Sequence, residues 1–393
     1  METIARSFIP LGFMSFGGPS GNIGLFERTF VDKVKSVTAD KFAEILALSS
    51  ILPGSTSLQL ALGLGVQISG CLPGGLMAVL LFSLPGLIIM TLAGKYLEIA
   101  DTITSKIAPQ WLFASAVSVV AVAGLTLFQK VCKTTLSVVL AFFAAVAALS
   151  ISPVLLPLIA LICGGFAAVL TAGVQAGAPL GVTLLGGAEG GSRSESSVGL
   201  GIGMRTGQTA LGIFTILGIS LFAFYPKSEI FNFFAAGASA AGGGAGVVPY
   251  LESLVNPEKF LLLFSLAMCL PGPLFNLGAG VGAVLGNGSL AWGLLCWLSL
   301  ITPGLLVYLV AAPVWSAMKG KWEAAHRALL GMQAAAVGLL LATTVQLYMG
   351  TVGLVWTRLF AVVIGMALQV VWDVEPFWVI LLGLGGSVLQ AAI

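Results

Sequence analysis

Two stretches of this sequence place a proline and a glycine inside apolar segments that would otherwise be continuous helices. Pro53-Gly54 lies in one stretch and Pro271-Gly272 in the other. Proline removes a backbone donor, clashes with the preceding turn and disfavours helical geometry at the residue before it. We therefore predict two broken helices, each with its proline opening the second half-helix. Small polar residues follow both breaks: Ser55, Thr56, Ser57 and Gln59 after the first, and Asn276 after the second.

The chemistry that a broken helix offers is anion binding. The first turn of a helix has free N–H groups and about half a positive charge, and such an end binds anions readily. Two half-helix ends that meet would supply about one positive charge without any arginine, and the hydroxyls and amides would complete the shell. The alternative is a simple kink, because neighbouring helices can satisfy the freed backbone groups. Pro85-Gly86 and Pro303-Gly304 lack following polar residues, so we expect a kink or a hinge there.

Two glycine motifs, one near the N-terminus and one in the second half of the chain, extend this pattern. The first is Phe16-Gly-Gly-Pro-Ser-Gly-Asn22 and the second is Gly242-Gly-Gly244. Glycine permits close approach of the backbone, and such loops expose N–H groups. The alternative is tight packing of helices, for which membrane proteins use small residues. We predict that the following residues border the anion site, with Asn22 as the best-placed polar side chain: Gly17, Gly18, Asn22, Gly243 and Gly244.

The composition identifies the class of protein that carries these motifs. Of 393 residues, 58% are hydrophobic and only 8% are charged, and the mean hydropathy is +1.07. A soluble chain is about 25% charged. Uncharged segments of about 18–25 residues are long enough to cross a bilayer core of ~30 Å. The sequence therefore predicts an all-α, multi-pass integral membrane protein surrounded by lipid. A cell membrane is the expected location, with an organelle left open, and the net charge of +2 gives no reason to expect a nucleic-acid partner.

The motifs recur at nearly constant offsets, which predicts an internal duplication. Gly17 aligns with Gly242, 225 positions later, whereas Pro53 aligns with Pro271 and Pro85 with Pro303, each 218 positions later. Both broken helices also start alike, because Thr38 and Asn256 are good N-caps. We predict a first repeat at 1–185, a linker with one unpaired span at 186–226, and a second repeat at 227–393.

The expected spans number about 10–13 and fall into two sets of six with one connecting span between them. An odd connector inverts the second repeat relative to the first, as in many secondary transporters, and would bring both breaks near the membrane midplane. The expected spans are 3–18, 40–69 (broken), 74–96, 108–129, 134–150, 153–174, 207–225, 228–245, 258–285 (broken), 289–312, 324–347, 352–371 and 376–393.

Together these motifs resemble the chromate ion transporter (CHR) family. That family has a Phe-Gly-Gly-Pro motif and then Leu-Pro-Gly-Pro-Thr-Ser-x-Gln, matched here by residues 16–19 and 52–59. Its second half carries Gly-Gly-Gly-His, Pro-Leu-Leu-Glu and Pro-Gly-Pro-Leu-Phe, matched by residues 242–245, 249–252 and 271–275. The resemblance implies an anion transporter that moves chromate, with sulfate as its chemical relative, and is coupled to protons. This chain departs from the pattern at four positions: Ser50, Ser55, Ala245 and Met268.

Proton coupling requires a titratable group near the motifs. Glu27 and Glu252 end the two glycine motifs at equivalent positions. A carboxyl that is partly buried there would have a raised pKa and could take up a proton near neutral pH. We favour Glu27, because its neighbour Arg28 ties it to an anion entrance. The alternative is that both glutamates lie at the membrane interface and only solvate a loop.

Other classes of function are less consistent with the residues. One histidine excludes the common zinc-enzyme patterns, and the chain has no nucleophile elbow and no phosphate-binding loop, so we expect neither an enzyme nor a bound cofactor or metal. The five cysteines have no metal or redox spacing. A passive anion channel would use the same broken helices and remains the alternative to a coupled transporter. A homodimer is left open.

Overall fold

The computed structural model describes residues 2–15, 18–104, 110–150, 200–225, 228–240, 244–317, 323–352 and 356–392. The predicted span at 153–174 and most of the linker lie outside these ranges. The first part of the chain forms α1 (Glu2–Met14), α2 (Gly18–Glu27), the π-helical η1 (Arg28–Lys33), α3 (Ala39–Ile51), α4 (Thr56–Ser69), α5 (Leu72–Thr104), α6 (Gln110–Val131) and α7 (Thr135–Ser150).

The second part of the chain follows a similar order of elements, after one additional helix, α9 (Met204–Phe224). The described residues of the whole chain contain helices, turns and loops and no strand. These elements are α10 (Glu229–Ser239), η3 (Gly244–Val247), α11 (Val248–Glu252), α12 (Pro257–Cys269), η4 (Leu274–Asn276), α13 (Leu277–Leu285), α14 (Leu290–Ala317), α15 (Glu323–Leu347), η5 (Tyr348–Val352), α16 (Trp356–Val371) and α17 (Pro376–Ala392).

The apolar helices confirm a multi-pass integral membrane protein. Within the described ranges, 5 helices are long and apolar enough to cross a bilayer. The half-helices of the predicted broken spans are each too short to cross alone. The long candidates are Leu72–Leu97, Gln110–Gln129, Met204–Ala223, Leu290–Trp315 and Gly331–Gly350.

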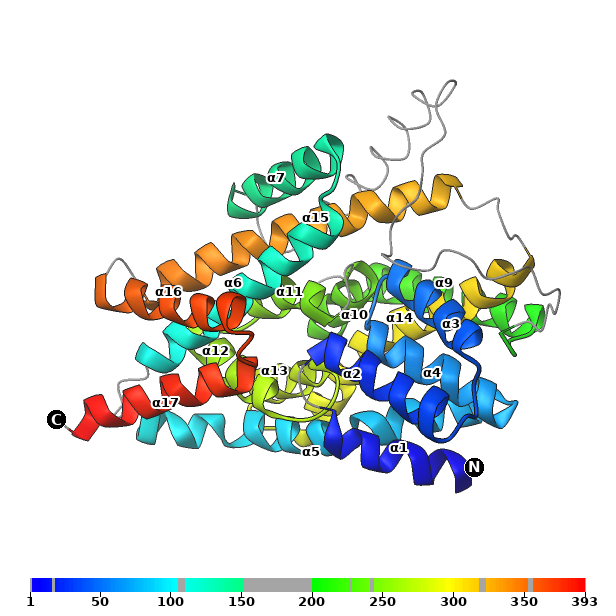
Figure 1. The fold of residues 1–393 in the computed structure, drawn as a ribbon, viewed down its shortest axis with the longest axis horizontal. Coiled ribbons are helices and arrows are strands. Elements are labelled where there is room, and N and C mark those ends of the chain that lie inside the picture. Colours follow the sequence, from blue (N-terminus) through cyan, green and yellow to red (C-terminus); the bar gives the residue numbers. More distant parts are fainter. Residues whose placement is uncertain are drawn as a thin grey trace.

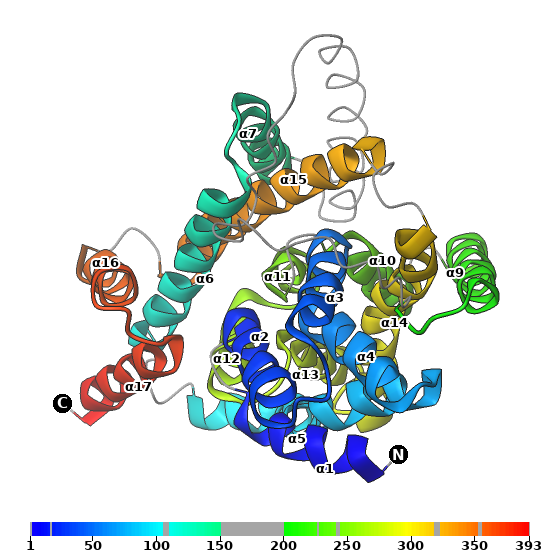
Figure 2. The same cartoon turned by 45° about the vertical axis from the view of Figure 1, so that its right-hand side comes forward.

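The helices are arranged as a core and an outer layer (Figures 1 and 2). The core contains α1–α5 and α10–α14, in which α5 packs on α1, α4 and α13, and α14 packs on α10 and α13. The outer layer contains α6, α7 and α15–α17, where α15 packs on α6 and α7, and α6 packs on α16 and α17. Figure 2 shows this layer on one side of the core, with α9 beside α14. The layers meet where α12 contacts α6 and α17, and where α11 contacts α15.

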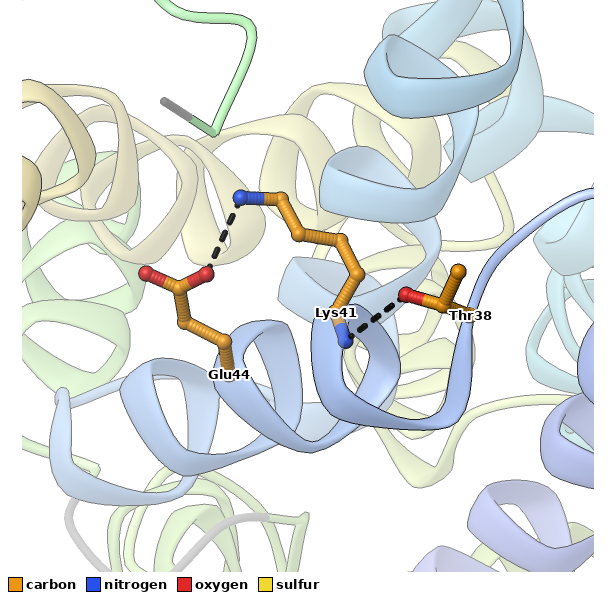
Figure 3. Close-up of polar contacts among 3 residues, drawn as sticks. All are labelled: Thr38, Lys41 and Glu44. Atoms are coloured by element: carbon orange, nitrogen blue, oxygen red, sulfur yellow. Dashed lines mark hydrogen bonds and ion pairs between the residues drawn. The ribbon is translucent and has the colours of Figure 1, made fainter. Parts of the chain in front are cut away.

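The first half of each broken helix begins at the N-cap that the sequence predicted. The Thr38 hydroxyl accepts the Lys41 N–H at 3.3 Å and starts α3, where Lys41 Nζ also pairs with Glu44 Oε2 at 2.9 Å (Figure 3). The Asn256 side chain accepts the Glu258 N–H at 2.9 Å and starts α12, with Pro257 at its first position. A capping oxygen satisfies one of the orphan donors of the first turn, which fixes where the helix begins.

Small residues let the core helices approach closely at corresponding positions. A Cβ on Gly12 of α1 would lie 2.7 Å from the Leu81 carbonyl oxygen of α5 and 3.2 Å from Pro85 Cδ. A Cβ on Gly237 of α10 would overlap the Leu300 carbonyl oxygen of α14 and lie 2.9 Å from Pro303 Cγ. Both positions therefore require glycine for helix packing, which is the usual role of small residues between membrane helices.

We expect Gly237→Ala to destabilise the folded protein, because the added methyl group meets backbone atoms that cannot rotate away. Overpacking of this kind costs about 1–3 kcal/mol. Thermal unfolding of the purified protein in detergent measures the effect. The matched control is Gly212→Ala in α9, where a Cβ would meet nothing within 4 Å. Equal unfolding temperatures for the two variants would contradict the packing argument.

Candidate functional site

Both predicted helix breaks are present, and glycine makes each of them. Gly54 has φ +108° and Gly272 has φ +118°, a region of backbone geometry that residues with a side chain rarely adopt. The prediction that the prolines open the second half-helices is wrong. The helix α4 starts at Thr56, with Ser55 as its N-cap, and α13 starts at Leu277 after the short η4. The left-handed glycine after each proline interrupts the helix and delays its restart.

Each break is hydrogen-bonded to the backbone just before the glycine motif of the other part of the chain. The Gly54 N–H donates to the Ala240 carbonyl at 2.7 Å, and the Gly272 N–H donates to the Ser15 carbonyl at 3.0 Å. Ser15 directly precedes the first glycine motif, and Ala240 lies two residues before the second. These two hydrogen bonds therefore join segments that are more than 180 residues apart in sequence, in a reciprocal arrangement.

The first turn of α4 forms a buried polar site with α2. Asn22 is 1% exposed, and its Nδ2 donates to Ser57 Oγ at 3.4 Å. Ser55, Thr56 and Ser57 are also buried. The Ser55 hydroxyl accepts the Leu58 N–H at 3.4 Å. Among the described residues, the backbone N–H groups of Thr56 and Ser57 and the Thr56 hydroxyl have no hydrogen-bond partner. These groups are the unfilled donors of a helix N-terminus, which suit an anion.

Gln59 and Asn276 lie beside the breaks, but their amide N–H groups bind carbonyls. Gln59 Nε2 donates to the Pro53 carbonyl at 2.7 Å and to the Gly304 carbonyl at 2.9 Å. Asn276 Nδ2 donates to the Ser83 carbonyl at 3.0 Å. The oxygens of both amides are buried and have no partner in the described structure. Both N–H donors of Gln59 are thus engaged, whereas Asn276 uses one of its two N–H donors.

The glycine motifs are described in part. Gly17 and Gly243 lie outside the described residues. Gly18 is the first residue of α2, and Gly244 is the first residue of η3. At the second break, Pro271 and Gly272 are half-buried. The η3 and η4 segments contact each other, so the second motif lies against the second break, as α2 lies against α4.

The two glutamates at equivalent positions have different surroundings. Glu27 and Arg28 are exposed where α2 passes into η1. Glu252 ends α11, outside the five candidate membrane helices, and is only 9% exposed. Burial raises the pKa of the Glu252 carboxyl to about 7, because loss of water penalises the charged form. In the described part of the chain, no cation pairs with Glu252.

The sequence did not single out the carbonyl groups of Ser15 and Ala240 or the contacts of Gly86 and Gly304. Every residue type has a backbone carbonyl, so residue identity does not indicate which carbonyls accept these hydrogen bonds. Only the alignment of the two halves of the sequence could have pointed to these positions. Ser15 and Ala240 are 225 positions apart, and Gly86 and Gly304 are 218 apart. These are the two offsets of the motif alignment.

Comparison with known proteins places the chain in a family. The chromate transporter family model matches residues 3–169 and 228–388. A chromate transport protein of Pseudomonas aeruginosa is 33% identical over 93 residues, which cover 23% of this chain and 22% of that protein. A probable chromate transport protein of Synechococcus elongatus is 31% identical over 94 residues, 24% of each chain. An uncharacterized transporter of Methanocaldococcus jannaschii is 24% identical over 365 residues, 87% of this chain and 83% of that one.

The named relatives are matched over short stretches. The alignment spans about a fifth of the length of the Pseudomonas protein and about a quarter of the Synechococcus protein. No solved structure matches this chain.

We expect Ser55→Ala to lower the stability of the protein even when no anion is present. The substitution removes the oxygen that caps α4, and loss of such a cap costs about 0.5–2 kcal/mol. Thermal unfolding in anion-free buffer gives the measurement. Thr215→Ala serves as the control, because that exposed hydroxyl binds only the Leu211 carbonyl of its own helix. An unchanged unfolding temperature for Ser55→Ala would remove the capping role.

Proposed function

Because the chain belongs to the chromate transporter family, we propose that it is a secondary transporter that carries chromate across the membrane. The observation that supports this most directly is the first turn of α4. It is buried, it has free backbone donors, and it lies against Asn22 in a protein with membrane-crossing helices. A tetrahedral dianion is the kind of ligand that such a helix end binds.

The site binds by dipoles and neutral donors. Its described polar side chains, Asn22, Ser55, Thr56 and Ser57, are all uncharged. Neutral donors hold an anion without the strong ion pair that would slow its release, and transport needs both binding and release. Sulfate has the same charge and a similar shape, so the same donors accept it. The proposed binding residues are Asn22, Ser55, Thr56 and Ser57, together with the backbone N–H groups of Thr56 and Ser57 and the backbone of Gly18 and Gly244. Gly54 and Gly272 shape the breaks, because their own N–H groups bind the carbonyls of Ala240 and Ser15.

We further propose that the chain consists of two inverted repeats, at 1–185 and 227–393, joined by a segment at 186–226. Paired contacts support this. Gly12 and Gly237 are 225 positions apart, and they lie against Pro85 and Pro303, which are 218 apart. Ser15 and Ala240 are also 225 positions apart, and they accept hydrogen bonds from Gly272 and Gly54, which are 218 apart. The two segments that match the family model start 225 residues apart, at 3 and 228. The helix α9 is the unpaired span whose single crossing would invert the second repeat.

For the coupled proton, the buried Glu252 is the better carrier than the exposed Glu27. With a pKa of about 7, its carboxyl binds a proton on a side below that pH and releases it on a side above it. Glu27 and Arg28 fit a role at the entrance, where an exposed arginine attracts anions over a Debye length of ~8 Å.

The transport assay uses the purified protein in sealed vesicles, with chromate and sulfate compared at imposed pH gradients. A coupled transporter accumulates anion against its gradient when the pH gradient is applied. Chromate flux that follows only the anion's own electrochemical gradient would show a channel instead. Absence of flux of either anion would contradict the proposed function.

We expect Thr56→Val to weaken chromate binding while leaving the protein folded. Valine keeps the shape and removes one hydroxyl donor. A hydrogen bond to a charged group contributes about 1.5–3 kcal/mol, so the dissociation constant should rise by about 10- to 150-fold. Thr343→Val is the control, since that buried hydroxyl binds the Leu339 carbonyl of its own helix in the outer layer. An unchanged dissociation constant for Thr56→Val would exclude Thr56 from the site.

We expect Glu252→Gln to separate anion exchange from proton-driven accumulation. Glutamine resembles the protonated carboxyl but cannot titrate, so exchange of anion for anion should persist while accumulation driven by a pH gradient is lost. In the unmodified protein, accumulation should decline when both sides are above pH 7, because Glu252 then stays deprotonated. Glu27→Gln is the control and should keep accumulation. Accumulation by Glu252→Gln against the anion gradient would rule out this carboxyl as the carrier.

A further inference from the structure

The second Pro-Gly pair of each half does not break its helix. Pro85-Gly86 lies inside α5, and Pro303-Gly304 lies inside α14, and both helices continue through these positions. Each glycine instead faces the helix break of the other half. A Cβ on Gly86 would overlap the Pro271 carbonyl oxygen. A Cβ on Gly304 would lie 3.0 Å from Gly54 Cα and 3.5 Å from the Pro53 carbonyl oxygen.

An amide hydrogen bond accompanies each of these close contacts. Gln59, which follows the first break, donates from Nε2 to the Gly304 carbonyl at 2.9 Å as well as to Pro53 of its own break. Asn276, which follows the second break, donates from Nδ2 to the Ser83 carbonyl at 3.0 Å, three residues before Gly86. Gln59 is 0% exposed and Asn276 is 3% exposed. The two arrangements are therefore alike: a break, a glycine of the opposite long helix, and a buried amide between them.

We propose that Gly86 and Gly304 are docking positions for the broken helices, and that Gln59 and Asn276 are positioning residues for anion binding. The first dock consists of Gly304, Gln59 and the Pro53-Gly54 break. The second dock consists of Gly86, Asn276 and the Pro271-Gly272 break. This inference rests on the proposed function, because the docks are proposed to orient the ends of the half-helices toward the bound anion.

The physical reason lies in the carbonyl groups at the first break. A carbonyl that pointed at the site would repel a dianion. Gln59 Nε2 binds the Pro53 carbonyl, which directs the negative end of this group to the amide. The close approach of Gly54 and Gly304 fixes the backbone just before the N–H groups of the α4 first turn. The donors that contact the anion are then held in place before it binds, which reduces the entropic cost of binding.

Direct contact between the Gln59 amide and the anion is disfavoured by the same geometry. Both N–H groups of Gln59 and one N–H group of Asn276 bind carbonyls, and the oxygens of both amides lack partners in the described structure. An oxygen turned toward a dianion is repulsive. A flipped Gln59 amide would place its oxygen against the carbonyls of Pro53 and Gly304, which is also unfavourable. Gln59 therefore acts on the anion through its break, and we assign Asn276 the same role because it holds the equivalent place at the second break.

The test is a set of double-mutant cycles on the purified full-length protein. The first dock is probed by Gln59→Ala and Gly304→Ala, and the second by Asn276→Ala and Gly86→Ala. Each variant is measured for its dissociation constant for chromate and for its unfolding temperature without anion. Gly212→Ala is the control, because a Cβ there meets nothing within 4 Å. A residue that serves only folding would lower the unfolding temperature and leave the affinity of the folded protein unchanged.

Each dock variant is expected to weaken chromate binding, whereas Gly212→Ala does not. Within one dock, both changes release the same break, so their effects on the dissociation constant should not be independent. The increase in the dissociation constant of the double variant should be about 2- to 150-fold smaller than the product of the two single increases. Between docks, the effects should multiply to within about twofold. Independent effects within a dock, or chromate binding by Gly304→Ala equal to that of Gly212→Ala, would overturn the proposal.

The experiment still tests the docks if one variant does not fold or if the unmodified protein does not bind chromate. If Gly86→Ala does not fold, the first-dock cycle carries the test, because the nearest contact of a Cβ at Gly304 is 3.0 Å and requires only a small shift. If the unmodified protein does not bind chromate, the unfolding temperatures still report the docks. Additive changes in stability within a dock then refute the docks. Coupled changes in a protein that binds no chromate support the docks and refute the chromate function.

Discussion

The structure depends on how it satisfies the backbone where two helices are interrupted. An unpaired N–H or C=O group in hydrocarbon costs several kcal/mol, so an interrupted helix persists only where protein supplies partners. Here the partners come from the other half of the chain. The Gly54 N–H binds the Ala240 carbonyl, and the Gly272 N–H binds the Ser15 carbonyl. Each half of the core therefore supplies a backbone acceptor to the broken helix of the other half.

The same constraint produces the candidate anion site. A helix that restarts inside the protein exposes fresh N–H groups at its first turn. In α4 this turn begins at Thr56, is capped by Ser55 and lies against the buried Asn22. The site thus needs no charged residue, which suits a chain with 8% charged residues. A buried arginine or lysine would have required its own desolvation to be offset by a permanent partner.

Much of the fold follows from local patterns in the sequence. The N-caps at Thr38 and Asn256 and the breaks after Leu52 and Leu270 were predicted correctly, because proline, glycine and capping oxygens act on their immediate neighbours. The delayed restart at Thr56 was missed, since it depends on the left-handed geometry of Gly54. The different burial of Glu27 and Glu252, and the carbonyl partners of Gln59, depend on contacts between distant segments. No local rule encodes those contacts.

The reciprocal contacts also bear on which parts of a transporter of this design can move. Rocking one half against the other would separate Gln59 from Gly304, Asn276 from Ser83 and both breaks from their backbone partners. Sliding the core against the outer layer of α6, α7 and α15–α17 would leave all of these contacts intact. It would instead break contacts such as the hydrogen bond from Gln333 Nε2 in α15 to the Ser50 carbonyl at 3.0 Å. The hydrogen bonds at the breaks therefore hold the two parts of the core together as one body.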